Sequence, residues 1–587
     1  MFTTFNLRVT LWAALAVALL LNYVTWLHDY PPVTPPTVAQ GAAAAGGATN
    51  GSGTALDTAV PEVGAAPAPE AAAPAVAPNA AAAVPGAAAA NLAASPGTAS
   101  AAGATALPPA QLVHVVTDVL DVQVSLDGGE LTRVDLLVYP QVKGQATPVR
   151  LLNRDSADTL FVLQSGLTSG AAGAAMPTHL ARFNAPGSEL RLQPGQDELQ
   201  LPLTWTDGKG VTVTKTYVFH RGRYQIGLDY SVANASGANW PYAPYMQLLR
   251  NNEPVATSYF HPESYAYKGP AYDDGQKYQK LKLGKEPPTL DQLIDGGWLA
   301  AMQHHFVVAI VPPVGAPWHY QLTTQGYEYR LTATGPPRQL APGATATLQQ
   351  ILYVGPKLQH ELEQASPRLY LVTDYGKLSF LARPLFWLLD QVHRIIGNWG
   401  WTIMIATLLL KLLFYPLSEA SMRSMARMKA LQPRIKLLQE QYKDQRDKLG
   451  KATMELYQKE KVNPVAGCLP MLIQMPVFLA FYWVLLESVE MRQAPFMGWI
   501  GDLSARDPLF ILPVMMAGAN FINFKLNPQM GDPTQQRMFM IMQIAMPVMF
   551  AFMPSGLVLY WTTNTVLSIL QQWNINRRLA AAAKARN

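Results

Sequence analysis

The stretch Trp399-Gly-Trp-Thr-Ile-Met-Ile-Ala-Thr-Leu-Leu-Leu-Lys-Leu-Leu-Phe-Tyr415 carries a single charged side chain, Lys411, among apolar neighbours. The stretch is long enough for an α-helix to cross most of a lipid bilayer. A cation inside such a helix costs about 2.5–3.5 kcal/mol on insertion scales. A segment rich in lysine and arginine follows from Ser418 onwards. We therefore predict a membrane span with an internal cation, followed by a basic soluble segment.

The composition of the whole chain agrees with a membrane protein that carries a large soluble part. Of 587 residues, 49% are apolar and only 14% are charged, and the length indicates several domains. Cys468 is the single cysteine, so disulfides within the chain and cysteine-held zinc or iron–sulfur sites are excluded. We find no phosphate-binding loop, metal-ligand spacing or serine–histidine pattern. The sequence thus predicts no catalytic residue, no metal and no cofactor.

Six apolar runs predict six membrane spans with both termini in the cytoplasm. Arg8 precedes the first run, which favours an inside N-terminus, and cations crowd the segment after the second span but are few in the loop 488–508. His28-Asp-Tyr-Pro-Pro32 follows the first run instead of a cleavage site, so residues 1–30 are expected to form an uncleaved signal anchor. The predicted spans are Val9–Leu27, Asn398–Leu417, Leu469–Glu487, Leu509–Phe524, Met538–Met553 and Leu557–Trp573.

Between the first and second spans the sequence predicts three further units. Residues 31–110 are mainly Ala, Pro, Gly, Thr and Ser, which cannot bury enough surface to fold, so we expect a disordered periplasmic linker. Residues 111–365 alternate in short β-branched and aromatic runs separated by turn signals, which is typical of a large all-β sandwich. Residues 377–397 have helical apolar spacing with a polar face. They predict an amphipathic helix on the outer membrane surface, or else the last helix of the soluble domain.

Within the β region the predicted strands are Val113–Leu126, Leu131–Tyr139, Val211–His220, Tyr224–Val232 and Gln321–Leu331. Asp127-Gly-Gly-Glu130 is expected to be the turn between the first two.

Two interpretations of Lys411 remain open from the residues alone. Lys411 lies about 9 Å from the cytoplasmic end of its helix, so its long stem can extend towards the interface at little cost. Alternatively, its ammonium faces a water-filled groove between helices. Polar residues of the spans are candidates to line such a groove, although each is also typical of ordinary helix contacts. These candidates are Thr407, Gln474, Asn520, Gln543, Thr562 and Asn564.

The cytoplasmic segment 418–463 predicts two helices packed as an antiparallel hairpin. One apolar stripe includes Leu431 and Ile435 and the other includes Tyr457. The turn is expected near Lys443–Asp444, with Gly450 as a rival position. The hairpin carries many cations, and the tail 574–587 is short and mildly basic.

Several motifs of the helical region resemble the YidC/Oxa/Alb family of membrane protein insertases. They are Tyr415-Pro-Leu417, Met425-Ala-Arg-Met-Lys-Ala-Leu-Gln-Pro433, Glu460-Lys-Val-Asn-Pro-Val-Ala-Gly-Cys-Leu-Pro-Met-Leu-Ile-Gln-Met-Pro-Val-Phe478, Ser488-Val-Glu-Met-Arg-Gln-Ala-Pro495, Asp502-Leu-Ser-Ala505 and Pro554-Ser-Gly-Leu-Val-Leu-Tyr560. The resemblance covers roughly 377–578. The first span and the large β domain look like the form found in Gram-negative bacteria, whose periplasmic domain is a non-enzymatic β-supersandwich similar to sugar mutarotases.

The resemblance implies an insertase core, residues 398–573, in which five helices enclose a hydrophilic groove. A cation in that groove, here Lys411, would receive the polar leading segment of a nascent inner-membrane protein. Many members carry arginine there, and lysine keeps the charge but loses the planar fork of donors. The groove would also include Thr407, Gln474, Asn520 and Thr562. The apolar slide for the client would include Met471, Met475, Pro476, Tyr560 and Trp561.

The family also implies partners. These are nascent membrane proteins, the lipid bilayer and the Sec translocon (SecYEG with SecDF), and the ribosome and the signal recognition particle receptor are further candidates. The hairpin cations Arg423, Arg427, Lys429, Arg434 and Lys436 would belong to a recruitment surface. No direct DNA binding is expected.

Two other classes compete with this interpretation on the residues alone. A polytopic transporter or channel would need an acidic partner near Lys411 and an internal repeat, and neither is evident. A membrane-anchored, sugar-binding or isomerising enzyme would need convergent histidine and glutamate side chains in a cleft of the β domain.

Overall fold

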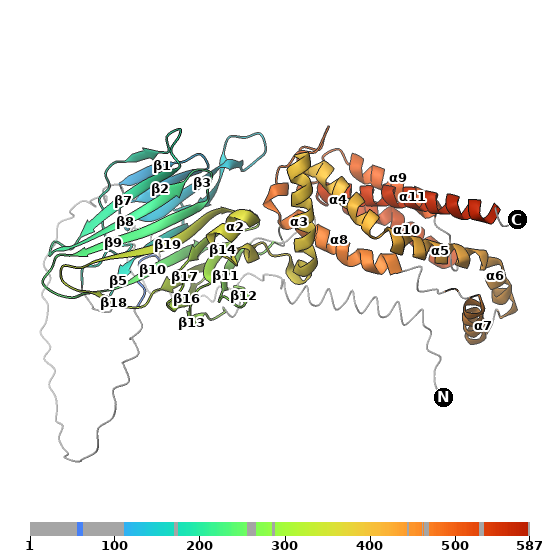
Figure 1. Ribbon diagram of the computed structural model, residues 1–587, viewed down its shortest axis with the longest axis horizontal. Helices are drawn as coiled ribbons and strands as arrows, with labels where there is room; N and C mark the ends of the chain where they lie inside the picture. Colours follow the sequence, from blue (N-terminus) through green and yellow to red (C-terminus); the bar gives the residue numbers. More distant parts are fainter. Residues whose placement is uncertain are drawn as a thin grey trace, which may run out of the picture.

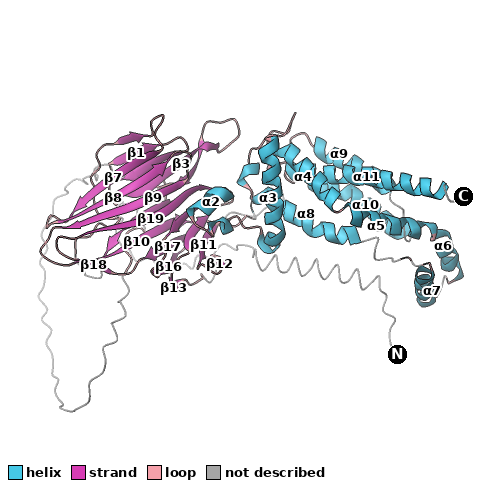
Figure 2. Ribbon diagram, viewed as in Figure 1, coloured by secondary structure: helices cyan, strands magenta, loops and turns pink. Residues whose placement is uncertain are grey.

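The computed structural model describes residues 56–62, 111–169, 174–254, 264, 266–284, 288–442, 445–460, 462, 469–526 and 533–584. The predicted first span lies outside these residues. The strands and the helices form two separate bodies side by side, as Figure 2 shows by colour. The chain passes from the β body into the helical body at the short helix α2 (Gln359–Ala365), and the elements follow each other as in Figure 1. The predicted large all-β domain followed by a helical region is therefore confirmed.

Two antiparallel-dominated sheets make the β body. One has 11 strands with the path β13-β16-β17-β10-β5-β3-β2-β1-β6, with β4 and β18 attached at its side, and the other has eight in the order β12-β11-β14-β15-β19-β9-β8-β7. The strands are β1 (Leu112–Val116), β2 (Leu120–Ser125), β3 (Glu130–Pro140), β4 (Pro148–Leu152), β5 (Phe161–Thr168), β6 (Glu189–Arg191), β7 (Glu198–Thr206), β8 (Val211–His220), β9 (Gln225–Asn234), β10 (Trp240–Asn251), β11 (Gly269–Asp273), β12 (Tyr278–Lys280), β13 (Asp291–Ile294), β14 (Trp298–Met302), β15 (Phe306–Val311), β16 (Trp318–Gln325), β17 (Glu328–Thr334), β18 (Arg338–Leu340) and β19 (Thr345–Pro356).

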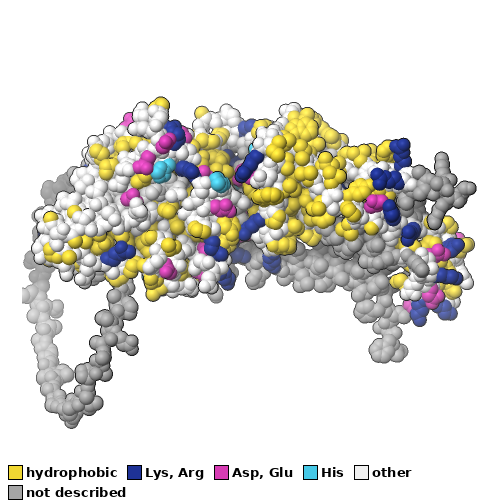
Figure 3. Space-filling view, in the orientation of Figure 1, with side chains coloured by type: hydrophobic (Ala, Val, Ile, Leu, Met, Phe, Trp, Pro, Cys, Tyr) yellow, Lys and Arg dark blue, Asp and Glu magenta, His cyan; other side chains and the backbone are white. Residues whose placement is uncertain are grey.

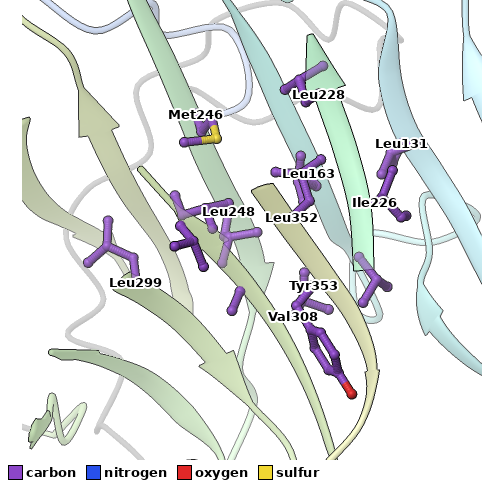
Figure 4. Packing of buried hydrophobic residues seen from close by; sticks show 14 of the residues in the cluster. Leu131, Leu163, Ile226, Leu228, Met246, Leu248, Leu299, Val308, Leu352 and Tyr353 are labelled. Carbon is purple, nitrogen blue, oxygen red and sulfur yellow. The ribbon is translucent and has the colours of Figure 1, made fainter. Parts of the chain in front are cut away.

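The apolar core of the β body lies between these sheets. Figure 4 shows Leu163 and Met246 of the larger sheet together with Ile226 and Leu352 of the smaller one. Along β8 and β9 buried and partly exposed residues alternate, because successive side chains of a strand point to opposite faces. This alternation is the pattern that predicts both strands from the sequence.

Two predicted strands are wrong in extent. The run Val113–Leu126 is not one strand but the hairpin β1–β2, because the Thr117 hydroxyl accepts the amide of Leu120 at 2.9 Å and closes a tight turn. The run Gln321–Leu331 is likewise interrupted, since β16 and β17 pair across a turn at Gly326, whose φ is +61°. A positive φ is readily adopted by glycine, which has no Cβ.

The linker prediction for 31–110 is also corrected at one place. Residues 56–62 lie against the larger sheet, with Leu56 and Asp57 each only 7% exposed. The remaining residues of that range lie outside the described part of the chain.

Helices build the second body. They are α3 (Ser379–Ile396), α4 (Trp399–Leu413), α5 (Tyr415–Ala430), α6 (Gln432–Gln441), α7 (Arg446–Lys459), α8 (Leu469–Glu487), α9 (Ile511–Leu526), α10 (Pro533–Phe550) and α11 (Ser555–Lys584), with short 3₁₀ turns η2 (Leu369–Val372), η3 (Gly376–Leu378) and η5 (Val489–Met491). The predicted amphipathic helix is α3, which buries Leu385 and Leu389 and ends at Gly397 with φ +71°.

The predicted span Asn398–Leu417 is not one straight helix. Helix α4 stops at Leu413 because Pro416 has no N–H to donate to the carbonyl of Leu412, and α5 starts at an angle of 61°. Helix α11 continues beyond the predicted span to Lys584, so most of the predicted tail 574–587 is helical.

Among the described residues, no helix taken alone is both long and apolar enough to cross a bilayer. Helix α4 combined with Tyr415–Ser424 of α5 passes that test as a bent pair, and Gln474–Glu487, Ile511–Leu526 and Met540–Phe550 are shorter apolar helices.

The two bodies touch through polar contacts around the end of α8. Arg492 Nη2 donates to the carbonyl oxygens of Pro140 at 2.8 Å and Gln141 at 3.1 Å. His304, in the turn between β14 and β15, bonds through Nε2 to the carbonyl oxygen of Leu486 at 2.9 Å. The β body is therefore attached directly to the end of α8 and to the loop 488–508 that follows it.

Candidate functional site

A pocket lies among α4, α5, α8 and α11, and Lys411 is part of its wall. Its cavity volume is about 50 Å³, and it is partly open to the outside. Both polar and apolar side chains face it. Its lining residues are Thr407, Leu410, Lys411, Phe414, Leu417, Ser418, Gln474, Val477, Tyr560 and Asn564.

Lys411 is held by a hydroxyl and not by a carboxylate. Its Nζ donates to Ser568 Oγ of α11 at 2.8 Å, and that hydroxyl donates to the carbonyl oxygen of Asn564 at 2.7 Å. Within the described residues, no aspartate or glutamate oxygen lies within 4.0 Å of Lys411 Nζ, and the nearby Glu419 pairs with Arg423. No carboxylate of the described residues therefore neutralises Lys411.

The structure brings together only some of the predicted groove residues. Thr407 and Gln474 line the pocket with Lys411, as does Asn564. Asn520 instead accepts a hydrogen bond from Thr565 at 3.3 Å between α9 and α11. Thr562 is buried, and its hydroxyl donates to the carbonyl oxygen of Val558 one turn earlier in α11. Asn520 therefore joins two helices, whereas the hydroxyl of Thr562 bonds within its own helix.

The predicted slide residues fall on two different surfaces. Met475, which is 50% exposed, and Pro476 face outward from α8. Tyr560 lies inside, stacked on Phe481 with ring centroids 4.3 Å apart, and it also lines the pocket. Trp561 packs edge-on against Phe478. The Met471 side chain lies outside the described residues.

The segment 418–463 was predicted to form two helices, but residues 418–430 belong to α5, and α6 and α7 follow. Helices α6 and α7 pack together, and an ion pair between Arg434 and Glu460 at 2.6 Å joins their far ends. Gly450 lies inside α7, which excludes it as the turn, while Lys443–Asp444 lies outside the described residues. In the apolar stripes Leu431 is buried and Tyr457 half-buried.

The cations predicted to form the recruitment surface mostly face solvent. Arg423 forms an ion pair with Glu419 one turn earlier, and Arg427 and Lys436 are exposed. The Lys429 side chain is not among those described. Figure 3 shows Lys and Arg gathered at the end of the molecule formed by α6 and α7, whereas hydrophobic side chains cover the visible face of the helices next to the β body.

Ser568, the partner of Lys411, was not predicted from the sequence, and neither was Ser418, which lines the pocket. Ser568 lies 157 positions from Lys411, and a lone serine in an apolar helix is too common to draw attention. Its spacing of one helical turn from Asn564 was the available signal, because both then lie on one face of α11.

Two known protein families match this chain one after the other, and together they cover most of its length. Residues 112–388 match the YidC periplasmic domain, and residues 391–582 match the 60Kd inner membrane protein family. Membrane protein insertase YidC from Thioalkalivibrio sulfidiphilus is 46% identical over 82% of this chain and 87% of its own. The insertase of the same name from Nitrosococcus oceani is 40% identical over 98% of this chain and 99% of its own.

One solved structure, described as an active YidC insertase with its first transmembrane domain resolved, covers 79% of this chain and 93% of its own, with a TM-score of 0.34 and 19% identity. The family matches place the β body in the periplasm and the helical body in the inner membrane, and the relatives are named for insertion and for no enzymatic reaction. From its sequence relatives over nearly its full length, this chain belongs to the YidC family of membrane protein insertases.

Proposed function

We propose that the pocket beside Lys411 is the point where the polar leading segment of a nascent membrane protein first enters. The observation that carries this proposal is the state of Lys411, whose ammonium faces the pocket, is held by Ser568 and has no carboxylate within 4.0 Å in the described structure. A cation of this kind attracts acidic and acceptor-rich chain segments. At a distance of about 5 Å and an effective dielectric constant of 20, one client carboxylate gains about 3 kcal/mol.

The pocket also shortens the apolar distance that a client's polar segment must cross. The client's own apolar span then partitions into lipid and supplies the driving force. The exposed Met475 and Pro476 on α8 suit a slide for that span, because methionine adapts to apolar partners of different shapes.

The remaining parts of the proposal rest on the sequence. We propose six spans with both termini in the cytoplasm, and the basic hairpin as the surface that recruits the ribosome or the signal recognition particle receptor. Cooperation with the Sec translocon for some clients rests on the family resemblance.

A transporter is the competing class, and it fits less well. It would need an acidic partner to relay or neutralise the charge of Lys411. The described residues supply a serine hydroxyl in that position instead.

The test is insertion of a client with a short acidic tail in cells depleted of this protein and supplied with variants. We expect Lys411→Arg to support insertion at close to the normal rate, Lys411→Ala to slow it and Lys411→Glu to abolish it. Lys377→Glu is the matched control, because Lys377 is an exposed lysine of η3, outside the pocket.

A second client with a lysine in place of each tail carboxylate separates charge from folding. Lys411→Glu should insert this client better than the acidic one. Normal insertion of the acidic client by Lys411→Glu would show that the charge of Lys411 has no role.

A further inference from the structure

A short N-terminal segment, Leu56–Glu62, is bound on the larger sheet of the β body. In the colour bar of Figure 1 it is the isolated blue piece near residue 60. Leu56, Asp57 and Pro61 are buried, although their neighbours in the sequence are mostly alanine, glycine and threonine. A segment of that composition has little tendency to fold alone, so specific contacts must hold it.

The apolar contact of the segment is made by Leu56. Its side chain is 7% exposed and packs in a small cluster with Leu160, Val162 and Leu249. Full burial of a leucine side chain stabilises a contact by about 1.5–3 kcal/mol. The cluster is separate from the main core of the β body, so its leucine-sized space is filled from the N-terminal segment.

The carboxylate of Asp57 is recognised by two side chains. Arg154 donates from Nη1 and Nη2 to its two oxygens at 2.8 and 2.9 Å, and Gln164 Nε2 donates to Oδ1 at 2.8 Å. Arg154 also pairs with Glu130 at 2.7 Å, and Gln164 Nε2 lies 2.9 Å from the same glutamate. A fork-to-fork arginine–carboxylate pair is both strong and selective in geometry.

The backbone of the segment is recognised as well. Arg330 Nη1 donates to the carbonyl oxygen of Ala59 at 2.7 Å. His179 lies 2.9 Å through Nε2 from the carbonyl oxygen of Asp57. A carbonyl only accepts, so Nε2 carries the proton, and Tyr245 then donates to Nδ1 at 2.6 Å and fixes the ring.

These contacts make a built site and not an accidental surface contact. Glu130, Gln164, His179 and Arg330 are each at least nine-tenths buried, and they come from three strands and a loop. The hydrogen bonds of the Arg330 guanidinium go to the carbonyl oxygens of Leu56 and Ala59, and its Nε has no partner among the described residues. The residues of this site bind an aliphatic side chain, the carboxylate of the residue that follows it and main-chain carbonyl oxygens. Together these groups are the features of a peptide.

We propose that the larger sheet carries a binding site for a short peptide in which an aliphatic residue precedes aspartate, and that Leu56–Glu62 occupies this site in cis. The segment is joined to the β body through residues 63–110, so it competes with a free peptide at the effective concentration that this tether sets. A free peptide of the same pattern therefore binds only when the segment has left. This inference is independent of the Lys411 pocket.

The test uses the full chain in lipid nanodiscs and a fluorescein-labelled peptide with the sequence of residues 54–64. In the opened variant Leu56→Ala/Asp57→Ala the N-terminal segment is expected to leave the site. The same variant with Arg154→Ala also lacks the guanidinium that binds the aspartate carboxylate. Fluorescence anisotropy is expected to show saturable binding to the opened variant at least ten times tighter than to the wild type. A peptide with asparagine in place of the aspartate should bind about 10- to 150-fold more weakly, as expected for loss of a hydrogen-bonded charge.

Hydroxyl-radical footprinting gives the second measurement and does not depend on the opened variant. The buried Leu56 side chain should be protected from oxidation in the wild type, and Arg154→Ala should remove that protection while the amides of β8 and β9 stay protected from hydrogen exchange. The proposal is overturned if Leu56 is oxidised in the wild type as fast as in the free peptide. It is also overturned if the opened variant, with β8 and β9 still protected, binds the peptide no better than the Arg154→Ala form.

Discussion

Replacement of Arg492 by alanine tests whether the β body is firmly attached to the helical body. Arg492 donates two hydrogen bonds, to Pro140 and Gln141, and its guanidinium lies 5.6 Å from the centroid of the Phe306 ring. A hydrogen bond from a charged group contributes about 1.5–3 kcal/mol and a cation–π contact about 0.5–1 kcal/mol. Because the two bonds share one nitrogen and the site is only half-buried, we expect a total loss of about 2–3 kcal/mol.

A loss of that size increases opening of this contact by about 30- to 150-fold, since 1.4 kcal/mol is a factor of ten. The assay is native-state hydrogen exchange of the amides of Met491 and Arg492, which donate to the carbonyl oxygens of Ser488 and Val489. Their protection should fall by the same factor. Arg506→Ala is the control, because Arg506 is an exposed arginine of the same loop.

Two results would refute this reasoning. Unchanged protection at Met491 and Arg492 would mean that the contact does not hold the bodies together. An equal fall of protection throughout β8 and β9 would mean that Arg492 stabilises the β domain as a whole and not the attachment.

Two further predictions concern the same region and the start of α4. Burial lowers the pKa of His304 to about 3, so the neutral ring donates to Leu486, and stability is complete above the unfolded pKa of 6.5 and falls as the pH drops towards 3. At pH 4.5 the loss of stability is up to about 2.7 kcal/mol. The variant His304→Gln keeps an N–H donor but cannot titrate, so it should reduce the pH dependence of thermal unfolding. An unchanged pH dependence would contradict this prediction. Gly400→Ala should destabilise by about 1–3 kcal/mol, because its Cβ would lie 2.0 Å from Phe496, and Phe496→Ala in the same chain should remove most of that cost; additive effects in the double variant would be evidence against the clash.

Local patterns were enough to predict much of this fold. Helix α8 begins and ends where its apolar run does, and β8 follows its alternating pattern from Val211 to His220. The break at Thr117 escaped prediction because a hydroxyl in an alternating run gives no sign of the amide that it will accept.

The functional contacts were harder to predict because they join distant residues. Ser568 meets Lys411 across 157 positions, and Asp57 meets Arg154 across 97. Neither partner stands in a recognisable motif. The available signal was that Asp57 is one of only three charged residues in 31–110, with Glu62 and Glu70.

Docking of Leu56 also sets how far the β domain can move from the first predicted span. About 29 residues separate Leu27 from Leu56, and about 84 separate Leu27 from Gln111, where the domain begins. Even fully extended, these lengths reach at most about 100 Å and 290 Å. The bound segment therefore shortens the tether between the first span and the β domain. Its release would nearly triple the greatest distance by which the domain and the span can separate.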